Sequence, residues 1–153
     1  MLNPDFKDML CAFNTEGVEY LVVGAYAMAA HGFPRATGDL DFWIRTDPEN
    51  ADRVMRSLAK FGAPMDQLSR EDLLTPNLVL QFGVEPSRID ILTSIDGVAF
   101  DAAYSGRLVS RLGDVDVPLL GLAELIQNKR VLGRPKDIAD VASLESIARR
   151  NHE

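Results

Sequence analysis

Residues 20–44 read YLVVGAYAMAAHGFPRATGDLDFWI, and this stretch decides the fold. The apolar run Leu21–Val23 has the length and composition of a buried strand. Gly24 ends that run, and the helix-forming composition of residues 25–31 predicts a short helix directly after it. A loop containing glycine and proline then leads into a second strand, which we expect over residues 39–45.

Two carboxylates fall on one face of this second strand. Because successive side chains alternate across a strand, Asp39 and Asp41 share a face. The opposite face is apolar and would anchor the strand in a core, through Leu40, Phe42 and Ile44. Asp is disfavoured inside strands, and like charges repel unless a cation lies between them. The pattern predicts a metal and nucleotide-phosphate site; the alternative is a solvated strand end, where Asp pairs are common.

A third carboxylate is expected beside the first two. Asp90 lies in residues 87–92 (SRIDIL), between Ile89 and Ile91, which should hold this short strand next to the one that carries the Asp pair. Three carboxylates converging from two strands make an all-oxygen site suited to Mg²⁺ or Mn²⁺. Arg88 lies on the same strand face as Asp90, and neutralising that carboxylate is the simplest role for it.

The remaining chain alternates helices with strands early, pairs strands in the middle and ends in helices. Helices are expected over residues 4–15, 25–31, 47–60, 121–132 and 136–149. Strands are expected over residues 19–23, 39–45, 78–83, 87–92, 107–111 and 115–119, the last four forming two hairpins. Residues 63–76 have the least regular pattern, and residues 96–106 read as a loop with one helical turn. This order predicts an α/β (α+β) domain with a mixed sheet flanked by helices.

Composition sets limits on the kind of protein. A length of 153 residues with 46% hydrophobic residues fits a single domain spanning residues 1–153 with a proper core. A net charge of −7 argues against a surface built for nucleic-acid binding, although a local basic patch stays compatible with it. The single Cys11 fits a reducing cytoplasm. Because no apolar run reaches about 18–20 residues, we expect a soluble cytoplasmic protein with no membrane span.

A glycine followed by a small residue opens the first helix of the decisive stretch. Gly24 and Ala25 would leave backbone N–H groups free at a helix N-terminus, where phosphate binds readily, although a lone glycine often just ends a strand. The order strand–Gly-small–helix–His-Gly–Arg-x-Thr-x-Asp-x-Asp resembles the nucleotidyltransferase superfamily that includes DNA polymerase beta. It is most similar to the minimal nucleotidyltransferases of bacterial toxin–antitoxin systems (type IV toxin-like). The segment from Leu125 to Asp140 resembles the terminal helical motif of that group.

The resemblance implies roles for particular residues. It implies that Gly24 and Ala25 bind phosphate, that Asp39 and Asp41 are metal ligands, and that Asp90 helps to deprotonate the acceptor hydroxyl. The further basic positions that the resemblance places at the nucleotide phosphates are Lys129 and Lys136. The family usually has Gly-Gly or Gly-Ser where this chain has Gly24-Ala25, so the hydroxyl of the second residue is missing.

Other polar residues have two readings each. Arg35 is a loop cation or a partner of the carboxylates or of a triphosphate, and Thr37 is a turn residue or a nucleotide contact. A solvated surface explains Lys129 and Lys136, in the one basic cluster of the sequence, about as well as phosphate or RNA contact does. Trp43 shares the Asp face and is expected to cover the sheet, with base stacking as the alternative.

These observations and the resemblance together imply an enzyme. The expected activity is Mg²⁺-dependent transfer of NMP from an NTP, such as ATP, to a hydroxyl acceptor. The acceptor would be a tRNA 3′ end, a partner protein of a toxin–antitoxin pair or a small molecule. The alternative is a catalytically inactive protein of the same fold that binds a nucleotide or a partner. A phosphatase or nuclease ranks below both, because a histidine-rich metal pattern is missing from the sequence.

Overall fold

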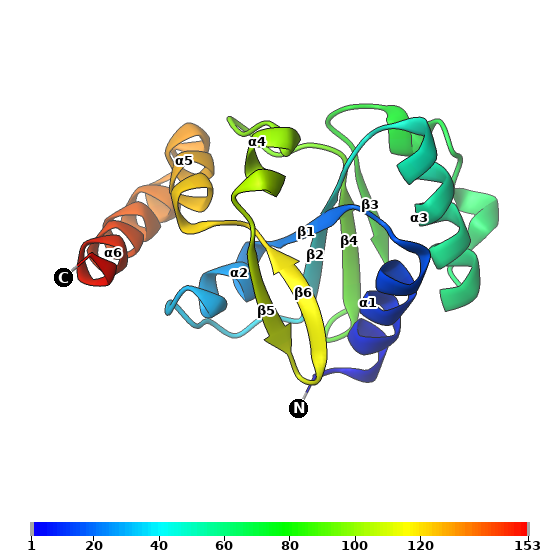
Figure 1. The fold of residues 1–153 in the computed structure, drawn as a ribbon, viewed down its shortest axis with the longest axis horizontal. Helices are drawn as coiled ribbons and strands as arrows, with labels where there is room; N and C mark the ends of the chain where they lie inside the picture. The colour runs from blue at the N-terminus through cyan, green and yellow to red at the C-terminus, as the bar shows by residue number, and fades with distance from the viewer. Residues whose placement is uncertain (1, 153) are drawn as a thin grey trace.

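The structure is a computed structural model that describes residues 2–152. Its helices and strands follow the expected order (Figure 1). In chain order the elements are α1 (Pro4–Glu16), β1 (Tyr20–Val23), α2 (Gly24–Ala30), β2 (Asp39–Ile44), α3 (Pro48–Phe61), the 3₁₀ turns η1 (Met65–Gln67) and η2 (Asp72–Leu74), β3 (Val79–Phe82), β4 (Arg88–Leu92), α4 (Phe100–Ser105), β5 (Leu108–Leu112), β6 (Val115–Leu119), α5 (Leu122–Leu132) and α6 (Pro135–Asn151).

Across residues 2–152, six strands form one mixed sheet in the order β3–β4–β2–β1–β6–β5. β1 and β2 are antiparallel neighbours at its centre. Each has a parallel partner on its outer side, β6 beside β1 and β4 beside β2. The two expected hairpins, β3–β4 and β5–β6, form the edges. The mixed sheet and the position of the Asp90 strand beside the Asp39 strand are therefore confirmed.

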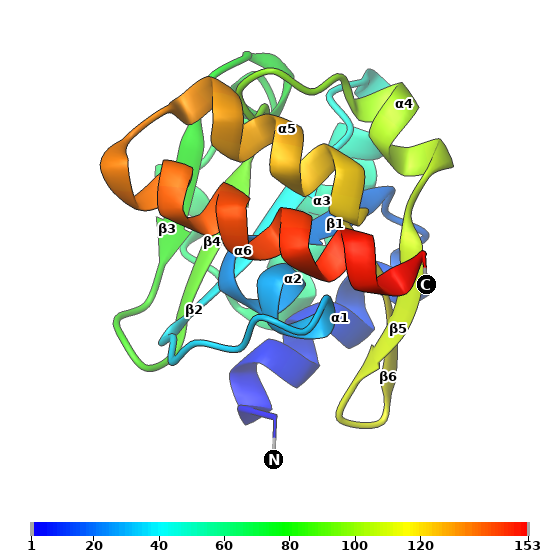
Figure 2. The same ribbon diagram turned by 90° about the vertical axis from the view of Figure 1, so that its left-hand side faces the viewer.

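Helices cover both faces of this sheet (Figures 1 and 2). On one face α1 and α3 pack against the fully buried side chains of Leu40, Phe42 and Ile44. On the other face α4, α5 and α6 pack against Leu21 and Trp43. The alternation expected within β2 is confirmed, because its apolar side chains enter the first core. Its carboxylates face the layer that contains α5 and α6.

Local sequence signals explain where the first helix begins and ends. The side chain of Asn3 accepts a hydrogen bond of 2.8 Å from the backbone N–H of Asp5, which satisfies one of the free donors of the first turn. Pro4 occupies the first helical position, where no N–H is needed. Gly17 ends the helix in the left-handed conformation, with φ of 72°.

Two segments that lacked a clear pattern have short elements. Residues 63–76 contain the turns η1 and η2, and the helical turn expected within residues 96–106 is α4. Within residues 2–152, no helix combines the length and apolar character that crossing a membrane requires.

Candidate active site

Strand register brings the three predicted carboxylates onto one face of the sheet. β2 and β4 run parallel, with Asp39 opposite Arg88 and Asp41 opposite Asp90. Residues paired in register on neighbouring strands point to the same side. The three carboxylates and one guanidinium therefore lie on one face of this strand pair, as the sequence predicted for Asp90.

Arg88 pairs with two of the three carboxylates. Its Nη2 donates a hydrogen bond of 2.7 Å to Asp39 Oδ2, and its Nε lies 3.3 Å from Asp90 Oδ1. The expectation that Arg88 neutralises Asp90 is confirmed, and the structure adds Asp39 as its closer partner. Arg88 therefore compensates part of the negative charge of this group.

This arrangement disfavours the charged form of the Asp41 carboxyl. Burial, and next the charge of Asp90, raise the pKa of the Asp41 carboxyl to about 7. Gly24 lies against the same carboxylate. A Cβ placed on Gly24 would lie 2.1 Å from Asp41 Oδ2, and the φ of Gly24 is +71°. Glycine is therefore required here for the β1–α2 turn to pass the carboxylate, in addition to any role toward phosphate.

Carboxylate oxygens are suitable ligands for a hard divalent cation, but the carboxylates of this site are not arranged around a common point. Asp39 Oδ1 is buried and has no hydrogen-bond partner within the described chain, and the buried Asp90 Oδ1 has the ion pair to Arg88 Nε but no hydrogen bond. Unpartnered buried carboxylate oxygens are the ligands that Mg²⁺ and Mn²⁺ take. As the side chains stand, however, no three acidic, histidine or cysteine groups in residues 2–152 are clustered tightly enough to hold an ion. Binding a cation here requires side-chain movement.

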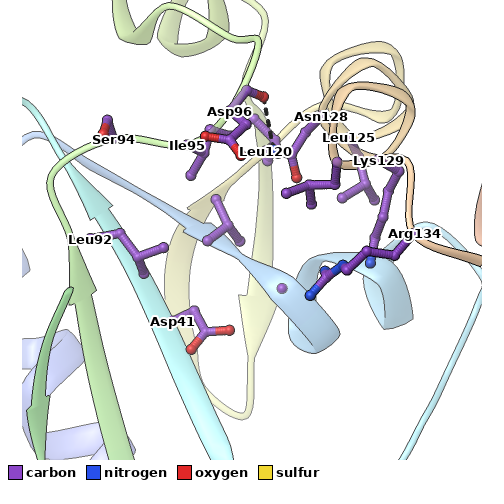
Figure 3. A pocket seen from close by; sticks show the side chains of 13 residues that line it. Asp41, Leu92, Ser94, Ile95, Asp96, Leu120, Leu125, Asn128, Lys129 and Arg134 are labelled. Carbon is purple, nitrogen blue, oxygen red and sulfur yellow. Dashed lines mark hydrogen bonds between the residues drawn. The ribbon is translucent and has the colours of Figure 1, made fainter. Parts of the chain in front are cut away.

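A pocket of about 330 Å³ opens beside Asp41 and Gly24 (Figure 3). Its size is within the range of small-molecule sites. The wall between β4 and α5 is aliphatic, and includes Leu92, Ile95 and Leu125. Polar groups come from the same two segments, Ser94 and Asp96 from the loop after β4 and Asn128, Lys129 and Arg134 from α5 and the turn after it. Aliphatic side chains together with the cationic Lys129 and Arg134 suit a ligand that has an apolar part and an anionic part.

Lys129 supplies positive charge to this pocket from α5. Its Nζ lies 3.2 Å from Asp140 Oδ2 and 3.5 Å from Asp137 Oδ1, both on α6. In Figure 3, Lys129 and Arg134 extend from the α5–α6 segment toward α2, while Asp41 projects from β2. The predicted phosphate partner Lys129 thus lines the same pocket as Gly24 and Asp41.

The other predicted nucleotide contacts lie at different distances from the pocket. Lys136 is exposed in the first turn of α6 and does not line it. Arg35 bonds to Asp140 Oδ1 at 2.7 Å and so ties the α2–β2 loop to α6. The Thr37 hydroxyl accepts a bond from the backbone N–H of Asp39 at 3.1 Å, which shapes the entry of β2. Ala25 follows Gly24 within α2 and is half-buried.

Sequence reasoning missed part of the pocket wall. Ser94 and Asp96 lie in the loop after β4, and Asn128 in α5 donates a bond of 2.9 Å to the carbonyl of Asp96. The sequence offered one clue to Asn128, because it directly precedes the predicted phosphate partner Lys129 and both residues lie in the same turn of α5. Trp43 is 2% exposed and packs edge to face on Phe100, so it covers the sheet as expected.

The comparison with solved structures supports the fold. No protein-family model and no curated protein matches the sequence. The structure is similar to the crystal structure of a Thermotoga maritima protein described as a "putative nucleotidyltransferase". The TM-score is 0.61 over 95% of this chain and 96% of that chain, at 16% sequence identity. At this identity the likeness shows the fold alone, so the chain has an α/β nucleotidyltransferase-like fold.

Proposed function

We propose that this protein is a Mg²⁺-dependent nucleotidyltransferase that transfers NMP from an NTP to a hydroxyl acceptor. One observation carries the proposal: Asp41 lines a pocket together with Gly24 and Lys129, and Asp39 and Asp90 lie beside it on the same face of the β2–β4 pair. Carboxylates next to a glycine turn and a basic group are what positioning a triphosphate requires. The fold shared with the Thermotoga maritima protein supports the same class of activity.

Each residue then has a distinct task. Asp39, Asp41 and Asp90 would hold Mg²⁺ or Mn²⁺, and a bound cation would supply charge neutralisation to the transferring phosphoryl group. Lys129 would bind the distal phosphates of the NTP, ATP among them, and backbone N–H groups at Gly24 would bind the phosphate nearest to the metal. The Asp90 carboxylate would also accept the proton of the attacking hydroxyl.

A protein or small-molecule acceptor fits the charges better than the tRNA 3′ end. The net charge is −7. Within the basic cluster, apart from Lys129 in the pocket, Arg134 contacts Asp137 and Arg130 contacts Glu145. Cations already paired with carboxylates attract an RNA backbone weakly. We therefore favour a hydroxyl on a partner protein, as in a toxin–antitoxin pair, and treat a small molecule as the second candidate.

One feature favours a different function. Ala25 offers no hydroxyl to a phosphate, which suits a non-catalytic protein that uses the same pocket to bind a nucleotide or a partner. Against this, retention of three repelling carboxylates costs stability that an inactive protein could recover by losing one. Turnover separates the two functions, because an inactive protein binds without transferring.

The first test measures thermal unfolding with each of the four NTPs, with and without Mg²⁺. Ligands that bind the folded state raise the unfolding midpoint by mass action. We expect a rise that needs both NTP and Mg²⁺ in the wild type and is lost in Asp39→Asn. The matched control is Asp116→Asn, which makes the same change on β6, away from the pocket.

The second test follows transfer of label from an α-labelled NTP to a supplied acceptor. Asp39→Asn should lower the transfer rate by about a hundredfold or more, since charge stabilisation of phosphoryl transfer is lost. Asp116→Asn should transfer at the wild-type rate. Transfer by Asp39→Asn at the wild-type rate would show that the carboxylates are not the catalytic groups.

A further inference from the structure

Arg88 is a cation that already contacts two of the three carboxylates. It lies on β4 opposite Asp39 and two residues before Asp90, so its guanidinium sits between two of the three acids. The strongest of these contacts is the 2.7 Å bond from Nη2 to Asp39 Oδ2. Arginine stays charged at any pH at which proteins fold, and its planar fork of N–H donors suits carboxylates.

The same contacts explain why the acids are not grouped around a common point. Arg88 engages Oδ2 of Asp39, whereas Oδ1 of Asp39 stays buried without a partner. Asp41 faces Asp90 across the strand pair rather than Arg88. Within residues 2–152 the acids therefore do not converge as three ligands of one ion. Releasing Arg88 frees Asp39 to turn toward Asp41 and Asp90.

We propose that Arg88 is an internal counter-cation that competes with the divalent metal for Asp39 and Asp90, and that metal binding displaces it. This inference rests on the proposed metal site. In the metal-free protein Arg88 limits repulsion among the three acids. In the metal-bound protein its charge is replaced by the ion.

The surroundings provide somewhere for the displaced side chain to go. The Arg88 side chain is 31% exposed, so it can leave without crossing a core. Glu85 is an exposed residue in the β3–β4 turn, three residues before Arg88. Glu85 and Asp39 both line an open hollow on this side of the sheet. Arg88 can therefore exchange one carboxylate partner for another and keep its charge compensated.

The test measures Mn²⁺ binding without nucleotide, by the loss of the free Mn²⁺ electron paramagnetic resonance signal. Arg88→Met keeps an unbranched apolar side chain of similar reach and removes the charge. We expect it to bind Mn²⁺ about tenfold more tightly than the wild type, because a half-buried competing ion pair is lost. A purely structural role for Arg88 would give the opposite result, since loss of order weakens binding. The matched control is Arg111→Met on β5, which breaks a pair with Asp116 and should leave Mn²⁺ affinity unchanged.

Arg88→Lys makes the inference testable if the methionine variant does not fold. Lysine keeps the charge but lacks the fork, so a smaller gain of a few fold in Mn²⁺ affinity is expected. Unchanged or weaker binding in the Arg88 variants, with Asp39→Asn abolishing binding, would overturn this inference and leave the proposed function intact. Mn²⁺ binding that is absent from the wild type and from both Arg88 variants, or that survives Asp39→Asn, would overturn the metal site and this inference with it.

Discussion

Gly24 has no side chain, and two features of the site depend on this: the backbone conformation of the β1–α2 turn and the position of the Asp41 carboxylate. Its φ of +71° is costly for any residue with a Cβ, and a Cβ would also lie 2.1 Å from Asp41 Oδ2. We expect Gly24→Ala to lose roughly 1–2 kcal/mol of stability from the left-handed backbone alone. It should also displace Asp41 and so abolish Mn²⁺ and NTP binding. Denaturant unfolding and metal titration measure the two effects.

Gly17 provides the matched control for this prediction. Its φ is +72°, and a Cβ there would meet nothing within 4 Å. Gly17→Ala should therefore lose a similar amount of stability and bind metal and nucleotide as the wild type does. Equal binding by the two alanine variants would show that the contact between Gly24 and Asp41 does not matter to the site.

At the scale of elements, a buried acid holds the junction between α5 and α6. Asp137 is fully buried and accepts bonds from Arg134, through the backbone N–H at 3.2 Å and through Nε at 2.6 Å. The hydrogen bond from the Arg134 side chain is the main cause that lowers the pKa of Asp137 to about 2. A folded-state pKa below the unfolded one stabilises the protein above about pH 4. That contribution is lost as the pH falls from about 4 toward 2.

The free energy of unfolding measured by urea at pH 5 and pH 3 tests this junction. The wild type should lose more stability than Asp137→Asn over this interval, because the amide has no proton to gain. At pH 5 the variant should be the less stable protein, since it cannot pair with Arg134 and Lys129. Asp66→Asn changes an exposed acid in η1 and should keep the wild-type pH dependence. Parallel pH profiles for wild type and Asp137→Asn would contradict the prediction.

The sequence could predict features that belong to a single strand or helix, but not how the chain runs from one element to the next. The shared face of Asp39 and Asp41 was predictable because alternation is a property of a single strand. That Arg134 and not the predicted Lys136 lines the pocket was not predictable, since both lie at the α5–α6 turn. Only the backbone path after Gly133, in the left-handed conformation, places Arg134 at the pocket and leaves Lys136 exposed.

Contacts between residues far apart in the sequence could not be predicted from local patterns either. Asn50 reads as a polar residue at the start of a helix, yet it is fully buried. Its side chain accepts from the N–H of Glu19 and donates to the carbonyls of Glu19 and Arg45, which joins α3 to the ends of two strands. The exact register of Asp41 against Asp90 is of the same kind. It depends on which strands neighbour one another in the whole sheet, whereas the sequence pattern describes one strand at a time.

For the molecule as a whole, two cores share the central strands. Phe42 on β2 belongs to the core beneath α1 and α3, and its neighbour Trp43 belongs to the core beneath α4, α5 and α6. Because consecutive residues of one strand serve both cores, loss of either core should unfold the other. This is the physical content of the prediction that residues 1–153 form a single domain.

Trp43 makes this cooperativity measurable, since it is the single tryptophan of the sequence and lies in the core beneath α4, α5 and α6. Leu58→Ala removes a fully buried side chain from the opposite core and should cost about 2–5 kcal/mol. We expect the denaturant midpoint to fall equally whether unfolding is followed by Trp43 fluorescence or by far-ultraviolet circular dichroism. A Trp43 transition that stays at the wild-type midpoint while the dichroism transition shifts would show that the two helical layers unfold separately. In that case the carboxylates of β2 would lie at a boundary between two units, and the pocket could open without global unfolding.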